Sequence, residues 1–260
     1  MAEGEVVYVV TYPPGALNTE LVKTVAGLVG KDPYDTRLLL SGEMPRIIAR
    51  YQIMQEAESI ARSLRGMGIT AFTCGDAELR RLPGKFIAHT LEFAGDGVLF
   101  RNRMGQTRRI GSEEGFLIIR GRAEIVTDME YTETKMKVNW RATLMTGGVP
   151  IMRRFKETAG ESTVEKELFI RAYDRESSES CVETLQHQMD YSCLGADMAL
   201  STQANLSTIA AKLRAAFPQA VLDEKMMKPH KVDIITGGAR ENLEINCRLL
   251  YMYYKNVSGA

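Results

Sequence analysis

The stretch from Leu21 to Cys74 constrains the fold most, because its apolar residues change their spacing several times within a short span. They recur at helical spacing up to Val29, and Gly30 then ends the pattern as the C-terminus of a helix would. Pro33 suits the first turn of a second helix. A strand, a helix and a closing strand are predicted next, at residues 47–51, 55–67 and 69–74. With a strand over 6–12 in front, the predicted order is βααβαβ, which can form a sheet covered by helices on one face.

Four short motifs follow one another in this stretch: a VKxV start, a G-x-x-x-x-x-x-[KR] second helix, a proline before the middle strand, and an EA-led helix that ends in G-[AI]. In this order they resemble the C-terminal domain of the bacterial ribosomal stalk protein and, more distantly, the Clp protease adaptor fold. In the stalk family the first two helices present basic residues that bind translational GTPases. Lys23 and Arg37 match two of those positions, whereas Asn18 and Ala26 stand where the family has basic side chains. The resemblance implies a fold and a surface for protein recognition, with Lys23 and Arg37 as candidate protein-binding residues, and does not imply membership of the ribosome.

Length and composition predict two domains in a soluble, cytoplasmic protein. At 260 residues and 45% hydrophobic residues, the chain exceeds one average domain. The polar stretch 75–85 separates a module at 1–78 from a second one at 86–260. Lysine plus arginine equals aspartate plus glutamate at 33 each, so net charge predicts no specific nucleic-acid partner. The sequence has no apolar run long enough for integral membrane association and no cleavable leader pattern at its start.

The second module is predicted to be a β-meander followed by a helix. From Phe86 onward apolar residues alternate, and Gly95-Asp96-Gly97 predicts a hairpin turn. The clearest strand covers 135–145 and is predicted to fold back at Gly147-Gly148. Further elements are a strand pair and two helices, at 164–173, 181–191, 203–217 and 241–254, the last of which also fits a strand. This arrangement loosely resembles the pleckstrin-homology-like barrels, with one strand too many, and the fold class is therefore α+β.

Motifs that carry catalysis are absent from the sequence. It has no glycine-rich phosphate loop, no GxSxG, no HExxH and no paired acidic motif for a divalent metal. His89 and His187 fall within predicted strands, and His230 lies in a loop. The four cysteines form no CxxC pair, which indicates reduced, mostly buried thiols. We therefore expect no metal site and no cofactor, and the sequence favours a protein that is not an enzyme.

Charge is unevenly distributed within the second module. Residues 101–156 hold twelve basic and six acidic residues, whereas residues 157–197 hold three basic and ten acidic residues. The two halves can pair across antiparallel strands. Alternatively, four arginines around one hairpin form an anion-binding tip, since guanidinium groups suit anions, and these are Arg101, Arg103, Arg108 and Arg109. The acidic half could then contact a basic partner or a second copy of the chain.

Three functional hypotheses follow. The first is a non-enzymatic, two-module protein-interaction or regulatory protein of the bacterial cytoplasm, with a protein partner and, as an open alternative, a homo-oligomer. The second is a module that binds an anionic ligand or lipid headgroup through the arginine hairpin. The third is an enzyme of an unrecognised type, since active sites are assembled in three dimensions.

Overall fold

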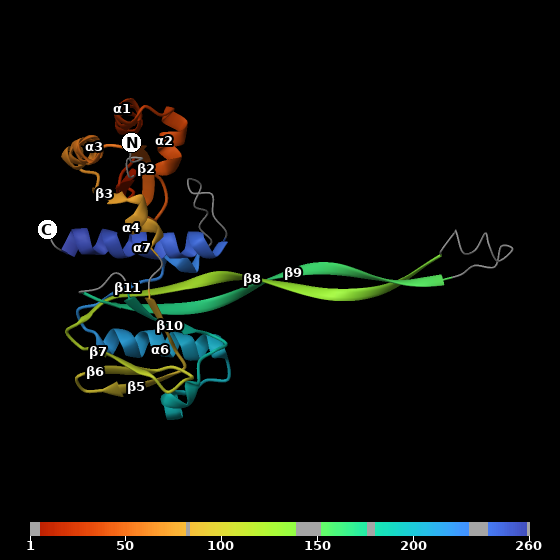
Figure 1. The fold of residues 1–260 in the computed structure, drawn as a ribbon. Coiled ribbons are helices and arrows are strands. Elements are labelled where there is room, and N and C mark those ends of the chain that lie inside the picture. Colours follow the sequence, from red (N-terminus) through yellow and green to blue (C-terminus); the bar gives the residue numbers. More distant parts are fainter. Residues whose placement is uncertain (1–5, 82–83, 139–151, 176–179, 229–238, 259–260) are drawn as a thin grey trace. The chain divides into compact units, whose positions relative to one another are not determined.

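The computed structural model describes residues 6–81, 84–138, 152–175, 180–228 and 239–258, and it shows an α+β protein (Figure 1). The N-terminal module contains β1 (Val7–Thr11), α1 (Thr19–Val29), α2 (Pro33–Leu39), β2 (Arg46–Tyr51), α3 (Met54–Gly66), β3 (Ala71–Gly75) and α4 (Asp76–Arg80). The second module begins with β4 (Gly84–Ala88), β5 (Thr90–Ala94), β6 (Gly97–Arg101), β7 (Thr107–Gly111), β8 (Gly115–Val138) and β9 (Met152–Asp174). It continues with β10 (Ser180–Leu185), η1 (Tyr191–Asp197), α6 (Thr202–Ala216), β11 (Val221–Asp223), η2 (Lys225–Met227) and α7 (Ala239–Ser258).

The N-terminal module has the predicted βααβαβ order. Its three strands form an antiparallel sheet in the order β2-β1-β3, with α1, α2 and α3 on one face (Figure 1). The side chain of Asn18 caps α1 by accepting a hydrogen bond from Leu21 N, and Gly30 ends the helix in the left-handed conformation, with φ 65°. Asp32 caps α2 in the same way, and Pro33 occupies its first turn as predicted. These local signals explain why this half of the chain could be predicted closely.

The second module contains two sheets that do not close into a barrel among the described residues. One has the order β11-β8-β9-β10-β4 and the other the order β5-β6-β7. The strand predicted over 86–93, before the Gly95-Asp96-Gly97 turn, is split into β4 and β5 at His89: β4 pairs in parallel with β10, whereas β5 pairs with β6 across the predicted hairpin. Helix α6 begins after its N-cap Ser201 and packs its buried leucines and Ile209 into the core of this module.

Other predictions for the second module had mixed outcomes. The strand predicted over 181–191 ends at Leu185, because a turn and η1 follow, so His187 lies beyond the strand. The region predicted as helix 241–254 is the helix α7, and the alternative of a strand is wrong. The sequence did not predict α4 or β11. Residues 139–145 and the Gly147-Gly148 turn lie outside the described residues, as does His230.

Helix α7 is buried on two sides. One side, with Ile245, Leu249 and Met252, joins a cluster with apolar residues of the N-terminal sheet, among them Tyr8, Val10, Ile47, Phe72 and Cys74. The other side, with Cys247, Leu250 and Tyr251, packs into a cluster that includes Phe116, Leu117 and Tyr173 of the second module. Figure 1 shows the helix between these two layers. Residues 1–123 and 167–260 accordingly form one compact unit, and the predicted separation into domains 1–78 and 86–260 stays a prediction.

Residues 124–166 form the second compact unit. It consists of the parts of β8 and β9 that lie beyond the five-stranded sheet, together with the segment that joins them.

Candidate functional site

The first two helices present the residues that the sequence predicted for protein binding. Lys23 lies on α1 and is exposed, whereas Val22, Val25 and Ala26 of the same helix are buried. Arg37 is exposed in the last turn of α2, whose buried residue is Thr36. Helices α1 and α2 pack against each other, so the two basic residues belong to one helical layer.

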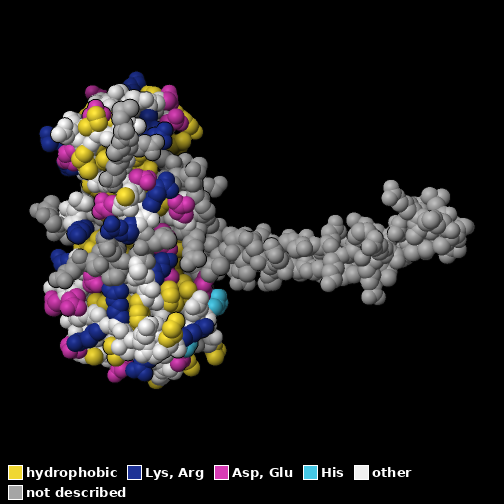
Figure 2. Space-filling view, viewed as in Figure 1, with side chains coloured by type: hydrophobic (Ala, Val, Ile, Leu, Met, Phe, Trp, Pro, Cys, Tyr) yellow, Lys and Arg dark blue, Asp and Glu magenta, His cyan; other side chains and the backbone are white. Residues whose placement is uncertain are grey.

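Two large apolar side chains accompany Arg37 on the exposed side of α2. Tyr34 is 69% exposed and Leu38 is 48% exposed. Residues three and four positions apart lie on one face of a helix, so Tyr34, Arg37 and Leu38 form a continuous strip opposite Thr36. We call this strip, together with Lys23, the α1–α2 face. Figure 2 shows hydrophobic and basic side chains mixed with acidic ones over the N-terminal module.

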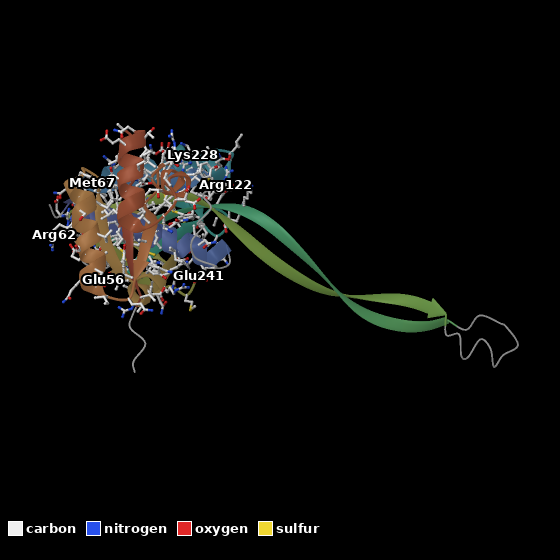
Figure 3. All side chains as sticks on the ribbon, turned by 90° about the horizontal axis from the view of Figure 1, so that it is seen from above. Glu56, Arg62, Met67, Arg122, Lys228 and Glu241 are labelled. Carbon is white, nitrogen blue, oxygen red and sulfur yellow. The ribbon has the colours of Figure 1, made fainter. Side chains whose placement is uncertain are left out.

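The basic residues of the N-terminal module differ in their pairing, and some outside the α1–α2 face, such as Arg50, also form no ion pair within the described part of the chain. On α3, which Figure 3 shows from above with Glu56 and Arg62 labelled, Arg65 is held by Glu58 at 2.5 Å. Lys23 and Arg37 form no ion pair with any other described residue. An exposed aromatic residue beside an unpaired arginine is the composition typical of protein-binding hot spots.

Strand geometry divides the arginines predicted to form an anion-binding tip, with Arg108 on one face of the β5-β6-β7 sheet and Arg101 and Arg109 on the other. Arg108 lies opposite Phe100 in the β6–β7 ladder and is bound by Asp174 at 3.0 Å. Arg109 is next in the strand, so it faces the other side of the sheet, where it pairs with Asp96. Arg101 ends β6 and borders a surface hollow of about 300 Å³, and Arg103 is exposed in the following turn. Binding of an anion there stays a prediction that rests mainly on Arg101 and Arg103.

A buried ionic network, which the sequence did not predict, joins α7 to the five-stranded sheet. The fully buried guanidinium of Arg171 donates one hydrogen bond to Glu183, at 2.6 Å, and two to Glu244, at 2.7 and 2.8 Å. Lys85 pairs with Glu244 and lies 3.7 Å from Glu183. Arg171 and Glu183 are directly opposite in the β9–β10 ladder, and Lys85 comes from the neighbouring β4. Two cations thus balance two anions, as buried charges require.

The network shifts the proton affinity of its members. Burial alone would raise the pKa of the Glu244 carboxyl, but hydrogen bonds and positive charge from Arg171, and then from Lys85, lower it below its ordinary value of 4.5. Burial alone would lower the pKa of Arg171. Nearby negative charge, including that of Glu183, raises this pKa, and so do the hydrogen bonds from Arg171 to Glu244. Both groups are therefore held in their charged forms.

This network predicts a specific loss of stability in acid. A carboxyl whose pKa is lower in the folded than in the unfolded state stabilises the fold. This stabilisation is complete at pH values above the unfolded-state pKa, and it is lost as the pH falls through the folded-state pKa. We expect the free energy of unfolding to fall as the pH drops below 4.5, and to fall less steeply in Glu244→Gln. Urea unfolding at a series of pH values measures this, and identical pH profiles for the two proteins would contradict it.

Two histidines and three buried cysteines lie within the described residues. His89 Nδ1 is 2.5 Å from the carbonyl oxygen of Gln188, and His187 is exposed. Cys74, Cys181 and Cys247 are buried and free, and burial raises the pKa of each of these thiols, to about 12, about 11 and about 12 respectively. Within the described ranges no group of three or more histidine, cysteine, aspartate or glutamate residues could hold a metal ion. None of the described helices combines the length and the apolar character needed to cross a bilayer.

Comparison of the chain with protein-family models, with curated proteins and with solved structures found no match.

Proposed function

We propose that this chain is a non-enzymatic interaction protein that docks a protein partner on its α1–α2 face. The observation that carries the proposal is the exposed strip of Tyr34, Arg37 and Leu38, which occupies one side of a short helix whose other side is buried. A tyrosine that leaves most of its ring in water gains free energy when a partner covers it.

The chemistry of the face indicates the kind of partner. An apolar residue or short helix would cover Tyr34 and Leu38, and carboxylates beside it would pair with Arg37 and Lys23. The partner is therefore expected to present an apolar anchor flanked by acidic residues. Because exposed charges contribute through screened interactions, binding should weaken as salt is raised.

Charge reversal on this face should remove the partner. We expect Lys23→Glu with Arg37→Glu to weaken binding of the partner by more than about tenfold, which is about 1.4 kcal/mol, because two attractive charges become repulsive. Quantitative affinity capture from native lysate, with wild-type and variant full-length chains as bait, measures the change.

The matched control reverses two exposed arginines elsewhere, in Arg62→Glu with Arg214→Glu, on α3 and α6. This variant has the same net charge as the first and should retain the partner. Equal loss from both variants would indicate a general charge effect, and retention by both would remove the α1–α2 face from consideration.

A further inference from the structure

Within its described residues, 124–138 and 152–166, the second compact unit is a ribbon of two strands, β8 and β9, with no third strand. The backbone of Arg175 donates to the carbonyl oxygen of Glu114 at 3.0 Å and closes the base of an antiparallel pair, β8 and β9. Among the described residues, β11 pairs with β8 at 117–119 and β10 pairs with β9 at 169–173, with one further hydrogen bond from Gln186 N to the carbonyl oxygen of Leu168. Residues 124–138 of β8 and 152–166 of β9 pair with no other described strand.

Such a ribbon leaves many backbone groups without strand partners. The 15 residues from 124 to 138 span about 50 Å at the usual rise of a strand. A two-stranded ribbon by itself is only marginally stable in water, and its edges are templates for another strand. The length of β8 and β9 is therefore best explained by a further strand that pairs with one edge.

Charge is sorted along this ribbon with no mixing of signs. The part near the sheet, residues 124–134 and 157–165, contains seven acidic residues and no basic residue. The described part farther along, residues 135–138 and 152–156, contains five basic residues and no acidic residue. On β8 the sign changes at Thr134, between Glu133 and Lys135.

We propose that two copies of this chain associate through antiparallel pairing of their β8 strands, with the two-fold axis at Thr134. In this register Glu133 lies opposite Lys135 of the second copy, and symmetry repeats the pair. Tyr131 lies opposite Lys137, and no like charges are directly opposite within 130–138. Opposite charges at facing positions of an antiparallel pair are favourable.

A second copy fits this surface better than a partner of one charge. An acidic partner or an anionic membrane would be attracted by the basic part and repelled by the acidic part, and a basic partner would meet the reverse. An identical strand in the opposite direction places the acidic part of one copy, 130–133, against the basic part of the other, 135–138. This inference uses a different surface from the α1–α2 face, so either can fail without the other.

Two complementary variants of the full-length chain test the pairing. Variant A carries Glu130→Lys and Glu133→Lys, and variant B carries Lys135→Glu and Lys137→Glu. We expect wild type to dimerise at low salt and each variant alone to associate more than about tenfold more weakly, because its overlap holds one sign of charge. An equimolar mixture of A and B, and the chain that carries all four substitutions, should dimerise again. Sedimentation equilibrium measures all of these.

Lys31→Glu, an exposed change on the loop between α1 and α2, is the control and should dimerise as wild type does. Circular dichroism of each variant checks that it is folded, and recovery in the A and B mixture excludes misfolding as the cause of the losses. A monomeric wild type at low salt would overturn the proposal, whether or not the chain binds vesicles of anionic phospholipid. A dimer that neither A nor B weakens would overturn the β8 pairing.

Discussion

Replacing Glu244 by glutamine is expected to lower the free energy of unfolding by about 3 to 5 kcal/mol, a large fraction of the 5 to 15 typical of a whole domain. The substitution keeps the shape of the side chain but leaves Arg171 and Lys85 with Glu183 as the remaining anion of the network, so one positive charge stays buried and uncompensated. Because α7 carries Glu244, the helix should lose part of its attachment to the five-stranded sheet. Chemical denaturation followed by circular dichroism measures the change.

Glu241→Gln is the matched control for this substitution. Glu241 lies in the first turn of the same helix and pairs with Arg80 at 2.7 Å, but both side chains are about 40% exposed. Exposed pairs of this kind contribute about 0 to 1 kcal/mol, so the control should be almost as stable as wild type. If the two substitutions cost the same, the buried network does not hold α7 in place.

Truncation of Leu213 to alanine is expected to cost about 2 to 5 kcal/mol. Leu213 is 1% exposed near the C-terminal end of α6 and belongs to the large cluster of the second module, together with Ile209 of the same helix and Phe217 at its C-cap. Because α7 packs on both modules, we expect a single unfolding transition that shifts as a whole. Hydrogen exchange of peptides from β1 and α6, measured in the same sample, follows both modules together.

Leu200→Ala provides the comparison, since Leu200 is fully exposed before α6 and its truncation should change stability by no more than about 0.5 kcal/mol. The result that would contradict this coupling is two unfolding transitions, of which Leu213→Ala shifts only that of the second module. It would support separate domains at 1–78 and 86–260.

The N-terminal module could be predicted from sequence because its signals are local. Asn18, Gly30, Asp32 and Pro33 mark the ends of α1 and α2 by capping and by backbone conformation, and these effects need no knowledge of the rest of the chain. The same holds for Ser201 at the start of α6.

Helix α7 was ambiguous for a physical reason. A helix buried on one side shows a single apolar stripe, but α7 is buried on two, so Leu249, Tyr251 and Tyr253 also alternate as in a strand. The buried network was missed because it assembles from Lys85, Arg171, Glu183 and Glu244, which are distant in sequence. The one available signal was a charged residue between apolar ones, as in Ile170-Arg171-Ala172.

The arginine hairpin shows the opposite case, in which nearness in sequence did not mean convergence in space. Arg108 and Arg109 are neighbours in β7, and strand alternation sends them to different faces and to different carboxylates. Lys23 and Arg37 are farther apart in sequence, yet they lie in one helical layer because α1 and α2 pack together.

Site-specific photo-crosslinking in living cells tests most directly whether the α1–α2 face docks a protein. A photoreactive amino acid placed at Tyr34 samples the face, and one placed at Gln203, which is exposed at the start of α6, samples an unrelated surface of the same chain. We predict that position 34 captures a defined protein that position 203 does not, and that Lys23→Glu with Arg37→Glu abolishes this crosslink. The same crosslinked proteins from both positions, or a crosslink at 34 that survives the charge reversal, would contradict docking at this face.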